Sequence, residues 1–255
     1  MQLITDIGNS DIVFGIYENE QWQHIWRTPS GRNRPQSDFK KFILTMLSQN
    51  NIPVESVTSV VLSSVVPKLS SVISNLLNSV FQKKVLVVNP SIYHQLNIKI
   101  TTNENEIGTD LVANAVAGFH FAKAACIVVD FGTALTFTSI DKDGYIQGVA
   151  IAPGIKTAMK ALASNAAQLP EIPLELPESA IGKDTVHAIQ AGILYGYIGL
   201  VKGVLEQTKQ ELGTCKVIAT GGLSHVLKPL QSEFDIIDKS LTMNGLRLIG
   251  EMVKS

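Results

Sequence analysis

Two stretches decide the fold: Asp6-Ile7-Gly8-Asn9-Ser10 and Asp130-Phe131-Gly132-Thr133-Ala134. Each follows an apolar run that reads as a buried strand, and each precedes a second strand, an acidic turn and a third strand. The first predicted meander therefore covers residues 3–27 and the second covers residues 126–151. Because the order returns with nearly the same spacing, the chain is predicted to contain two copies of one structural half.

Helices and further strands are predicted around both meanders. Apolar residues recur at helical spacing in 38–49, 69–81, 109–123, 155–167, 184–212 and 243–253, and strand-like runs occupy 57–66, 85–88 and 216–219. Strands that alternate with helices indicate an α/β protein. We expect two lobes, residues 1–115 and 116–255, each with a mixed five-stranded sheet flanked by helices.

Composition narrows the function classes. The 255 residues are 45% hydrophobic and 17% charged, which is typical of a compact globular protein. The formal net charge is -1 and no long run has one sign, so we expect neither a nucleic-acid nor a membrane-surface partner. The two cysteines, Cys126 and Cys215, adjoin strand-like runs and are expected to be buried thiols in a reducing compartment.

No basic-then-apolar leader opens the chain, so a cytoplasmic protein is expected. The most apolar long stretch, 188–205, contains four glycines and ends near Lys202 and Glu206. These residues favour a packed helix over a membrane span.

The Asp-x-Gly turns have the chemistry of a phosphate site. Gly8 allows backbone N–H groups to approach an anion, and Asn9 and Ser10 add side-chain donors. A carboxylate beside a phosphate needs a metal between them, so Asp6 suits Mg²⁺, directly or through water. One such turn alone is more often an ordinary hairpin.

The second turn strengthens the phosphate interpretation. It repeats the carboxylate and the glycine, and Thr133 and Thr136 supply hydroxyl groups. Two such turns facing each other across a cleft would suit a nucleoside triphosphate. Neither a Walker motif nor a GxGxxG motif offers a competing nucleotide site.

Three more motifs have both a structural and a functional interpretation. In Gly108-Thr109-Asp110, the aspartate is either a helix cap or a general base for a substrate hydroxyl. In Gly182-Lys183-Asp184-Thr185, the last two residues are helix caps or ligand contacts. Gly221 and Gly222 follow a strand, where an adenine ring or a ribose could lie against the backbone. The five histidines lack metal-ligand spacing and are expected to be structural.

These motifs together resemble type III pantothenate kinases, members of the actin-like, ribonuclease H-like sugar-kinase superfamily that are also related to Bvg accessory factor. The resemblance covers nearly the whole chain and rests on seven motifs in the family's order: 6–10, Ser63-Ser64-Val65-Val66-Pro67, Glu106-Ile107-Gly108-Thr109-Asp110, 130–136, Pro153-Gly154, 182–185 and Thr220-Gly221-Gly222. It implies duplicated actin-like lobes and transfer of the ATP γ-phosphate to pantothenate, the first step of coenzyme A synthesis.

The resemblance also implies roles for individual residues. The ATP-phosphate segment would be Asp6, Ile7, Gly8, Asn9, Ser10, Asp11, Ile12 and Val13, with Gly132, Thr133, Gly221 and Gly222 completing the nucleotide site. The pantothenate site would comprise Gly108, Thr109, Asp110, Leu111 and Thr185, with Asp110 as the proton acceptor. Asp130 would bind a monovalent cation, K⁺ or NH₄⁺, and Mg²⁺ would accompany ATP. The family is homodimeric, with the acceptor site near the subunit interface.

Two departures from the family pattern fall in the acceptor site. Leu111 follows Asp110 where the family has arginine, and the stretch 99–104 lacks the family's tyrosine and proline. Loss of the arginine removes a bidentate partner for an anionic substrate. Two alternatives therefore remain open: a nucleotide-binding accessory module with weakened catalysis, and a kinase for another small alcohol.

Overall fold

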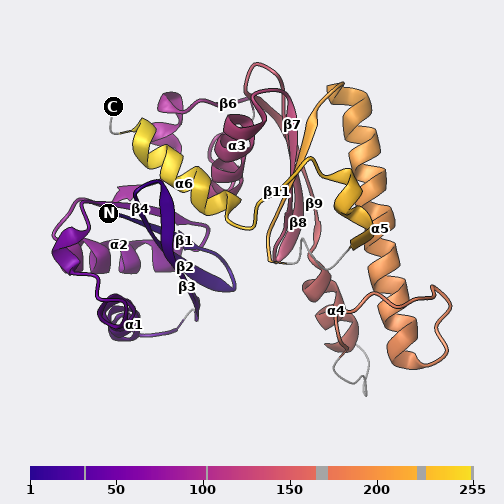
Figure 1. The fold of residues 1–255 in the computed structure, drawn as a ribbon, viewed down its shortest axis with the longest axis horizontal. Helices are drawn as coiled ribbons and strands as arrows, with labels where there is room; N and C mark the ends of the chain where they lie inside the picture. Colours follow the sequence, from indigo (N-terminus) through magenta and orange to yellow (C-terminus); the bar gives the residue numbers. More distant parts are fainter. Residues whose placement is uncertain (32, 102, 165–171, 223–227, 254–255) are drawn as a thin grey trace. The chain divides into compact units, whose positions relative to one another are not determined.

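The computed structural model describes residues 1–31, 33–101, 103–164, 172–222 and 228–253. Their contacts group into two compact units (Figure 1). Unit 1 comprises Met1–Ala117 and Thr242–Ser255, and unit 2 comprises Gly118–Leu241. Each unit is described by itself below.

Unit 1 is built on a five-stranded mixed sheet. The strands are β1 (Gln2–Ile7), β2 (Asp11–Glu18), β3 (Gln21–Pro29), β4 (Ser59–Ser64) and β5 (Leu86–Val87), in the order β3-β2-β1-β4-β5. β2 pairs antiparallel with β1 and β3, whereas β4 pairs parallel with β1. The central strands thus have neighbours on both sides, and four of the six residues of β1 and four of the six of β4 are buried.

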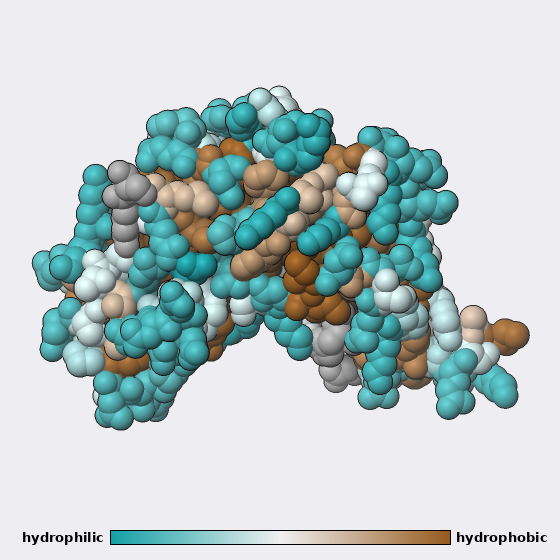
Figure 2. All heavy atoms as spheres, turned by 45° about the horizontal axis from the view of Figure 1, so that its top comes forward, coloured by the Kyte–Doolittle hydropathy of each residue, from teal (hydrophilic) through white to brown (hydrophobic). Residues whose placement is uncertain are grey.

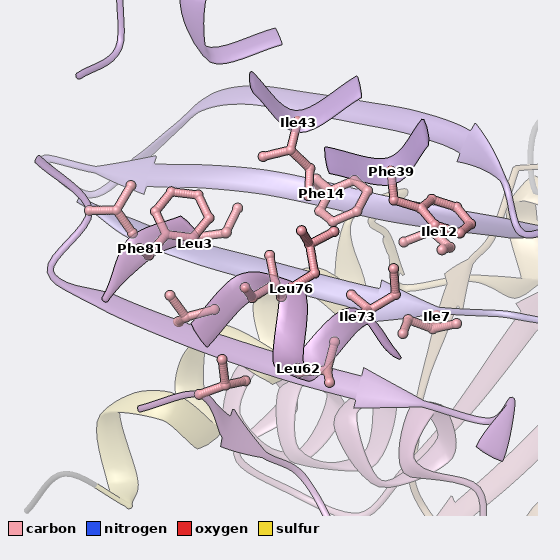
Figure 3. Packing of buried hydrophobic residues seen from close by; sticks show 14 of the residues in the cluster. Leu3, Ile7, Ile12, Phe14, Phe39, Ile43, Leu62, Ile73, Leu76 and Phe81 are labelled. Carbon is pink, nitrogen blue, oxygen red and sulfur yellow. The ribbon is translucent and has the colours of Figure 1, made fainter. Parts of the chain in front are cut away.

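Helices cover both faces of this sheet. α1 (Gln36–Gln49) and α2 (Pro67–Phe81) bury their apolar stripes against one face, where Phe14, Phe39 and Ile73 are among the residues of the core (Figure 3). α6 (Leu241–Met252) packs on the opposite face, because Gly250 lies against Val61 of β4. α3 (Thr109–Ala122) lies beside α6, and the backbone at Ala113 is so near Gly245 that no side chain fits there. Short elements complete the unit: η1 (Val54–Ser56), η2 (Pro90–Gln95) and β6 (Lys99–Ile100).

Unit 2 repeats the meander. Its strands are β7 (Cys126–Phe131), β8 (Ala134–Ile140), β9 (Tyr145–Pro153), β10 (Lys216–Thr220) and β11 (Ile236–Ile237), in the order β11-β10-β7-β8-β9. As in unit 1, the first strand pairs antiparallel with the second and parallel with a later strand. α4 (Ile155–Ser164) and α5 (Thr185–Leu212) supply residues to one apolar core, and η3 (Lys228–Glu233) adds Leu230. The duplicated α/β architecture predicted from the repeat is confirmed.

Most boundaries agree with the predicted ones, with a few differences. β3 extends to Pro29, beyond the predicted end of the meander at residue 27, because it keeps pairing with β2 as far as Asp11. The predicted strand 57–66 is shorter, since Pro67 opens α2. Residues 165–167 of the helix predicted over 155–167 lie outside the described residues. The terminal helix, expected in the second lobe, contacts unit 1 through Thr242 and Asn114.

α5 has two contrasting faces. Its buried stripe faces the core and consists of Ala191, Leu194, Tyr197, Val201 and Leu205. Glycines at 192, 196, 199 and 203 recur at intervals of three and four residues on the opposite side, and each has open space where a side chain would be. The helix is long and apolar enough to cross a membrane by length and composition alone, and 28% of its most apolar window is buried.

The surface also carries isolated apolar side chains, visible as brown areas between the teal ones in Figure 2. Ile151 and Ile181 are the most exposed large hydrophobic residues among those described, at 67% and 77%.

Candidate active site

The first Asp-x-Gly turn joins β1 to β2. Asp6 is the second-to-last residue of β1 and lies in register with Val13 on one side and Ser63 on the other. Three residues separate the strands, and the Gly8 N–H donates to the Asp11 carbonyl oxygen at 2.9 Å. The side chains of Asn9 and Ser10 are exposed at the tip. Their side-chain donors therefore face solvent, where they could bind a phosphate.

A buried serine stabilises this turn by hydrogen bonds. The Ser30 hydroxyl, 1% exposed, donates to the Gly8 carbonyl oxygen at 2.6 Å, and the Ser30 N–H donates to the Ser10 carbonyl oxygen at 2.9 Å. Arg27 forms a long ion pair with Asp11 at 3.4 Å, and its side chain is 62% exposed. The turn is fixed by backbone and hydroxyl hydrogen bonds, since an exposed ion pair adds little.

The second turn joins β7 to β8 with only two residues, Gly132 and Thr133, between the strands. The Gly132 N–H donates to the Ala134 carbonyl oxygen at 3.0 Å. Thr133 offers its carbonyl oxygen to two donors, the Gly154 N–H at 3.0 Å and the Thr157 hydroxyl at 2.7 Å. Gly154 passes so near the turn that an added Cβ would overlap the carbonyl oxygens of Gly132 and Thr133. The start of α4 thus fixes the shape of this turn.

Asp130 lies beside several of the site residues predicted in unit 2. It lies in register with Thr136 of β8 and with Thr220 of β10. Gly221 follows Thr220 with φ at +90°, and a Cβ there would come within 2.6 Å of an Asp130 carboxylate oxygen. A glycine at 221 is therefore required both by its φ and by the approach of the carboxylate. Gly222 follows in open space.

Asp110 opens α3 together with Thr109. Its Oδ1 accepts a hydrogen bond from the Leu111 N–H at 2.8 Å, and any side chain at Gly108 would collide with that oxygen. Burial is the main cause of a raised Asp110 pKa, while hydrogen bonds from backbone N–H groups lower it. A partly buried carboxyl group with a raised pKa holds a proton more readily, as a proton acceptor must.

Ser63 connects the Asp6 strand to the Asp110 motif. It is fully buried on β4, where the parallel register places it beside Asp6, and its hydroxyl lies 2.9 Å from the Thr109 hydroxyl. β1, β4 and the start of α3 thus bring the metal-capable carboxylate and the candidate base into one neighbourhood of unit 1. Ser63 belongs to one of the seven family motifs, but its position beside Asp6 depends on a parallel pairing of strands that is not visible in the sequence.

The last predicted site residue, Thr185, is the exposed first residue of α5 in unit 2. Asp184 caps that helix by accepting from the His187 N–H at 2.9 Å. The capping interpretation of Asp184 is therefore correct. Thr185 has an exposed position where a ligand contact is sterically possible.

A metal site made of protein ligands alone is not found in the described ranges, which contain no group of three or more His, Cys, Asp or Glu side chains placed around one ion. Asp6 and Asp130 each offer one carboxylate. Such a carboxylate fits Mg²⁺ that is held mainly by water and phosphate oxygens.

Comparison with known proteins places the chain in a family. The model of the type III pantothenate kinase family matches residues 2–207. A type III pantothenate kinase of Brevibacillus brevis is 41% identical over 256 residues, 100% of both chains, and one of Geobacillus sp. strain WCH70 is 38% identical over 98% of this chain and 97% of its own.

Among solved structures, a conserved Baf family protein of Campylobacter jejuni superimposes with a TM-score of 0.63. The two sequences are 20% identical, and the superposition covers 99% of this chain and 98% of the other. At this identity the likeness shows the fold alone. The fold is of the actin-like sugar-kinase type, as the resemblance implied. The match to the family model and the full-length relatives show that this chain belongs to the type III pantothenate kinase family.

Proposed function

We propose that the chain transfers the γ-phosphate of ATP to the hydroxyl of pantothenate, the first step of coenzyme A synthesis. One observation carries the proposal: Ser63 lies in register with Asp6 and bonds to Thr109, the residue before Asp110. Family membership supports it independently.

In this proposal Asp110 accepts the proton of the acceptor hydroxyl as the phosphoryl group arrives. Its raised pKa makes it a better acceptor than an ordinary aspartate. Phosphoryl transfer depends mostly on positioning and on charge stabilisation, so the Leu111 N–H hydrogen bond that orients the Asp110 carboxylate matters as much as its basicity.

The two turns would bind the nucleotide. Exposed Asn9 and Ser10 and the backbone around Gly8 would contact phosphate oxygens, and Thr133, Gly221 and Gly222 would contact the remainder of ATP. Asp6 would hold Mg²⁺ through water, and Asp130 would bind K⁺ or NH₄⁺. Mg²⁺ would supply charge neutralisation on the β- and γ-phosphates.

The direct test measures ADP release with ATP, Mg²⁺, K⁺ and millimolar pantothenate. We expect pantothenate-dependent turnover in the wild type and its collapse in Asp110→Asn, with ATP binding and thermal unfolding retained. Absence of pantothenate-dependent turnover in the wild type would refute the proposal. Unfolding of Asp110→Asn would mean instead that Asp110 serves mainly as a helix cap.

Leu111 supports two alternatives, because an aliphatic side chain follows Asp110 in α3. A nucleotide-binding accessory module would bind ATP but not pantothenate in calorimetry. A kinase for a different acceptor would release ADP with another member of a panel of hydroxylated metabolites. Binding of both ATP and pantothenate would exclude the accessory module.

We also propose a cytoplasmic homodimer, with the acceptor site near its interface. The open glycine stripe of α5 supports it, because glycines at 192, 196, 199 and 203 let a second helix approach closely. Light scattering should give twice the monomer mass, and Gly196→Leu together with Gly199→Leu should yield monomers. A wild-type monomer at micromolar concentration would contradict the dimer.

A further inference from the structure

An open cavity in unit 1 adjoins the Asp110 motif. Its volume is about 670 Å³, and Gly108 and Thr109 form part of its wall. α2 contributes Ser70 and Ser74, which are four residues apart and so lie on one side of the helix. η2 contributes Tyr93 to another wall. The cavity therefore combines hydroxyl groups with apolar side chains such as Val65 and Val88, and it is next to the proposed proton acceptor.

The charges around this cavity do not suit an anion. Among the described residues of its wall, the ionisable side chains are Tyr93, Glu104 and Glu106. The first turn of α2 also has fewer N–H groups to offer an anion, because those of Leu69 and Ser70 donate to the Val66 carbonyl oxygen. A carboxylate placed here would meet two glutamates and no cation from this wall, whereas an uncharged polar group would meet hydroxyl donors and acceptors.

Tyr93 is the most enclosed polar side chain of the wall, at 3% exposed. Burial, followed by the nearby carboxylates of Glu104 and Asp110, raises the pKa of Tyr93 to about 12. The phenol therefore stays protonated through the neutral range and can donate a hydrogen bond. The described residues give this hydroxyl no hydrogen-bond partner, so it remains available to a ligand.

We propose that this cavity binds the uncharged hydroxyl and amide part of the acceptor and that the Tyr93 hydroxyl donates a hydrogen bond to it. The inference rests on the proposed function and extends it: Tyr93 determines acceptor affinity, and the carboxylate of pantothenate lies outside this cavity. Because Tyr93 and Thr109, the residue before Asp110, line the same cavity, the ligand group that Tyr93 contacts lies close to the reacting hydroxyl.

The test compares Tyr93→Phe with Tyr17→Phe, a matched loss of a phenol hydroxyl elsewhere in unit 1, where Tyr17 packs against Trp22 and Arg247. Steady-state kinetics are measured with pantothenate and with its neutral analogue, in which CH₂OH replaces the carboxylate. We expect Tyr93→Phe to raise the KM of both acceptors about tenfold, the loss of one hydrogen bond, with KM for ATP unchanged. The pH profile should keep its shape, since Tyr93 does not titrate in the assay range.

Several outcomes would overturn the inference. If the acceptor KM values of Tyr93→Phe equal those of the wild type, or if Tyr17→Phe raises them as much, Tyr93 does not bind the acceptor. The proposed function would not be affected by either result. A rise for pantothenate alone would mean that Tyr93 faces the carboxylate. Absence of wild-type turnover with pantothenate would refute the proposed function and this inference together.

A second variant covers the case in which Tyr93→Phe fails to fold. Ser74→Ala changes the part of the cavity wall that α2 contributes, and we expect a KM increase of about threefold for both acceptors with an unchanged melting temperature. Unchanged acceptor KM values in a folded Ser74→Ala would exclude the cavity as the acceptor site.

Discussion

The two Asp-x-Gly turns share a sequence pattern but differ in construction. In both, the aspartate is the second-to-last residue of a central strand. The first turn has three residues between its strands and the second has two, so the glycine N–H closes a ring to Asp11 in one and to Ala134 in the other. Both turns have exposed tips, Asn9 and Ser10 in the first and Gly132 and Thr133 in the second, but the hydroxyl group that holds a turn carbonyl comes from Ser30 in the first and from Thr157 in the second.

The difference shows what the duplication retained. The carboxylate, the glycine and one backbone hydrogen bond occupy matching places in both units, because the residue after the third strand donates its N–H to the last residue of the turn. That residue is Ser30 after β3 and Gly154 after β9. The hydroxyl donor differs, since the first turn takes it from Ser30 itself and the second from Thr157 in the first turn of α4.

The largest expected effect separates the two aspartates. Asp6→Asn and Asp130→Asn should each lower kcat/KM about 100-fold or more, because each removes the carboxylate proposed to hold a cation that neutralises the phosphates, Mg²⁺ at Asp6 and K⁺ or NH₄⁺ at Asp130. Titration of Mg²⁺ should distinguish Asp6→Asn, and titration of K⁺ should distinguish Asp130→Asn. Identical ion dependence in both variants would contradict separate roles.

The next effect concerns the glycines. Gly154→Ala should destabilise the protein by about 2–3 kcal/mol, because its Cβ would overlap two backbone carbonyl oxygens that cannot move freely. Gly8→Ala should cost less, since its Cβ would meet one oxygen, of Asp11, at 3.2 Å. Urea unfolding measures both, with Gly148→Ala as the control in open space. A greater loss of stability in Gly8→Ala than in Gly154→Ala would contradict this prediction.

A smaller effect concerns the hydroxyl groups that hold the turns. Ser30→Ala should cost about 1 kcal/mol and raise KM for ATP, because it leaves the partly buried Gly8 carbonyl without its donor. Thr157→Ala should cost less, since Thr157 is exposed and the Thr133 carbonyl keeps its bond from Gly154. Thermal unfolding and ATP titration give both quantities. Equal losses of stability in the two variants would mean that burial does not make the Ser30 hydrogen bond more important than that of Thr157.

The smallest effect distinguishes Asp110 from both turn aspartates. Burial raises the pKa of Asp110 in the folded chain, so the fold favours its neutral form. That stability is present at low pH and is lost as the pH rises through the folded pKa. Asp110→Asn should therefore melt at a higher temperature than the wild type at pH 8, with the gain shrinking at pH 4. Exposed Asp143→Asn is the control, and an unchanged difference between the two pH values would contradict the assignment.

Much of this could be predicted from local pattern. The repeat predicted the two meanders, and apolar periodicity predicted α1, α2 and α5 because their buried stripes follow helical spacing. Contacts between distant segments could not be predicted. Ser63 acquires its role through parallel pairing of β1 with β4, and Tyr93 through a cavity formed by three separate segments. Short elements such as β6 and β11 have two residues each and leave too little pattern to detect.

The return of α6 to unit 1 has a consequence for synthesis of the chain. Trp22 donates to the Asn244 side chain at 2.8 Å, and Met243 lies against Gly15, so the first sheet is completed by residues translated after all of unit 2. Unit 2 is continuous and can fold as soon as it leaves the ribosome, whereas unit 1 must wait with one face of its sheet uncovered. A nascent chain stalled before Leu241 would therefore expose apolar surface in its earliest-made part and would be a natural target for chaperones.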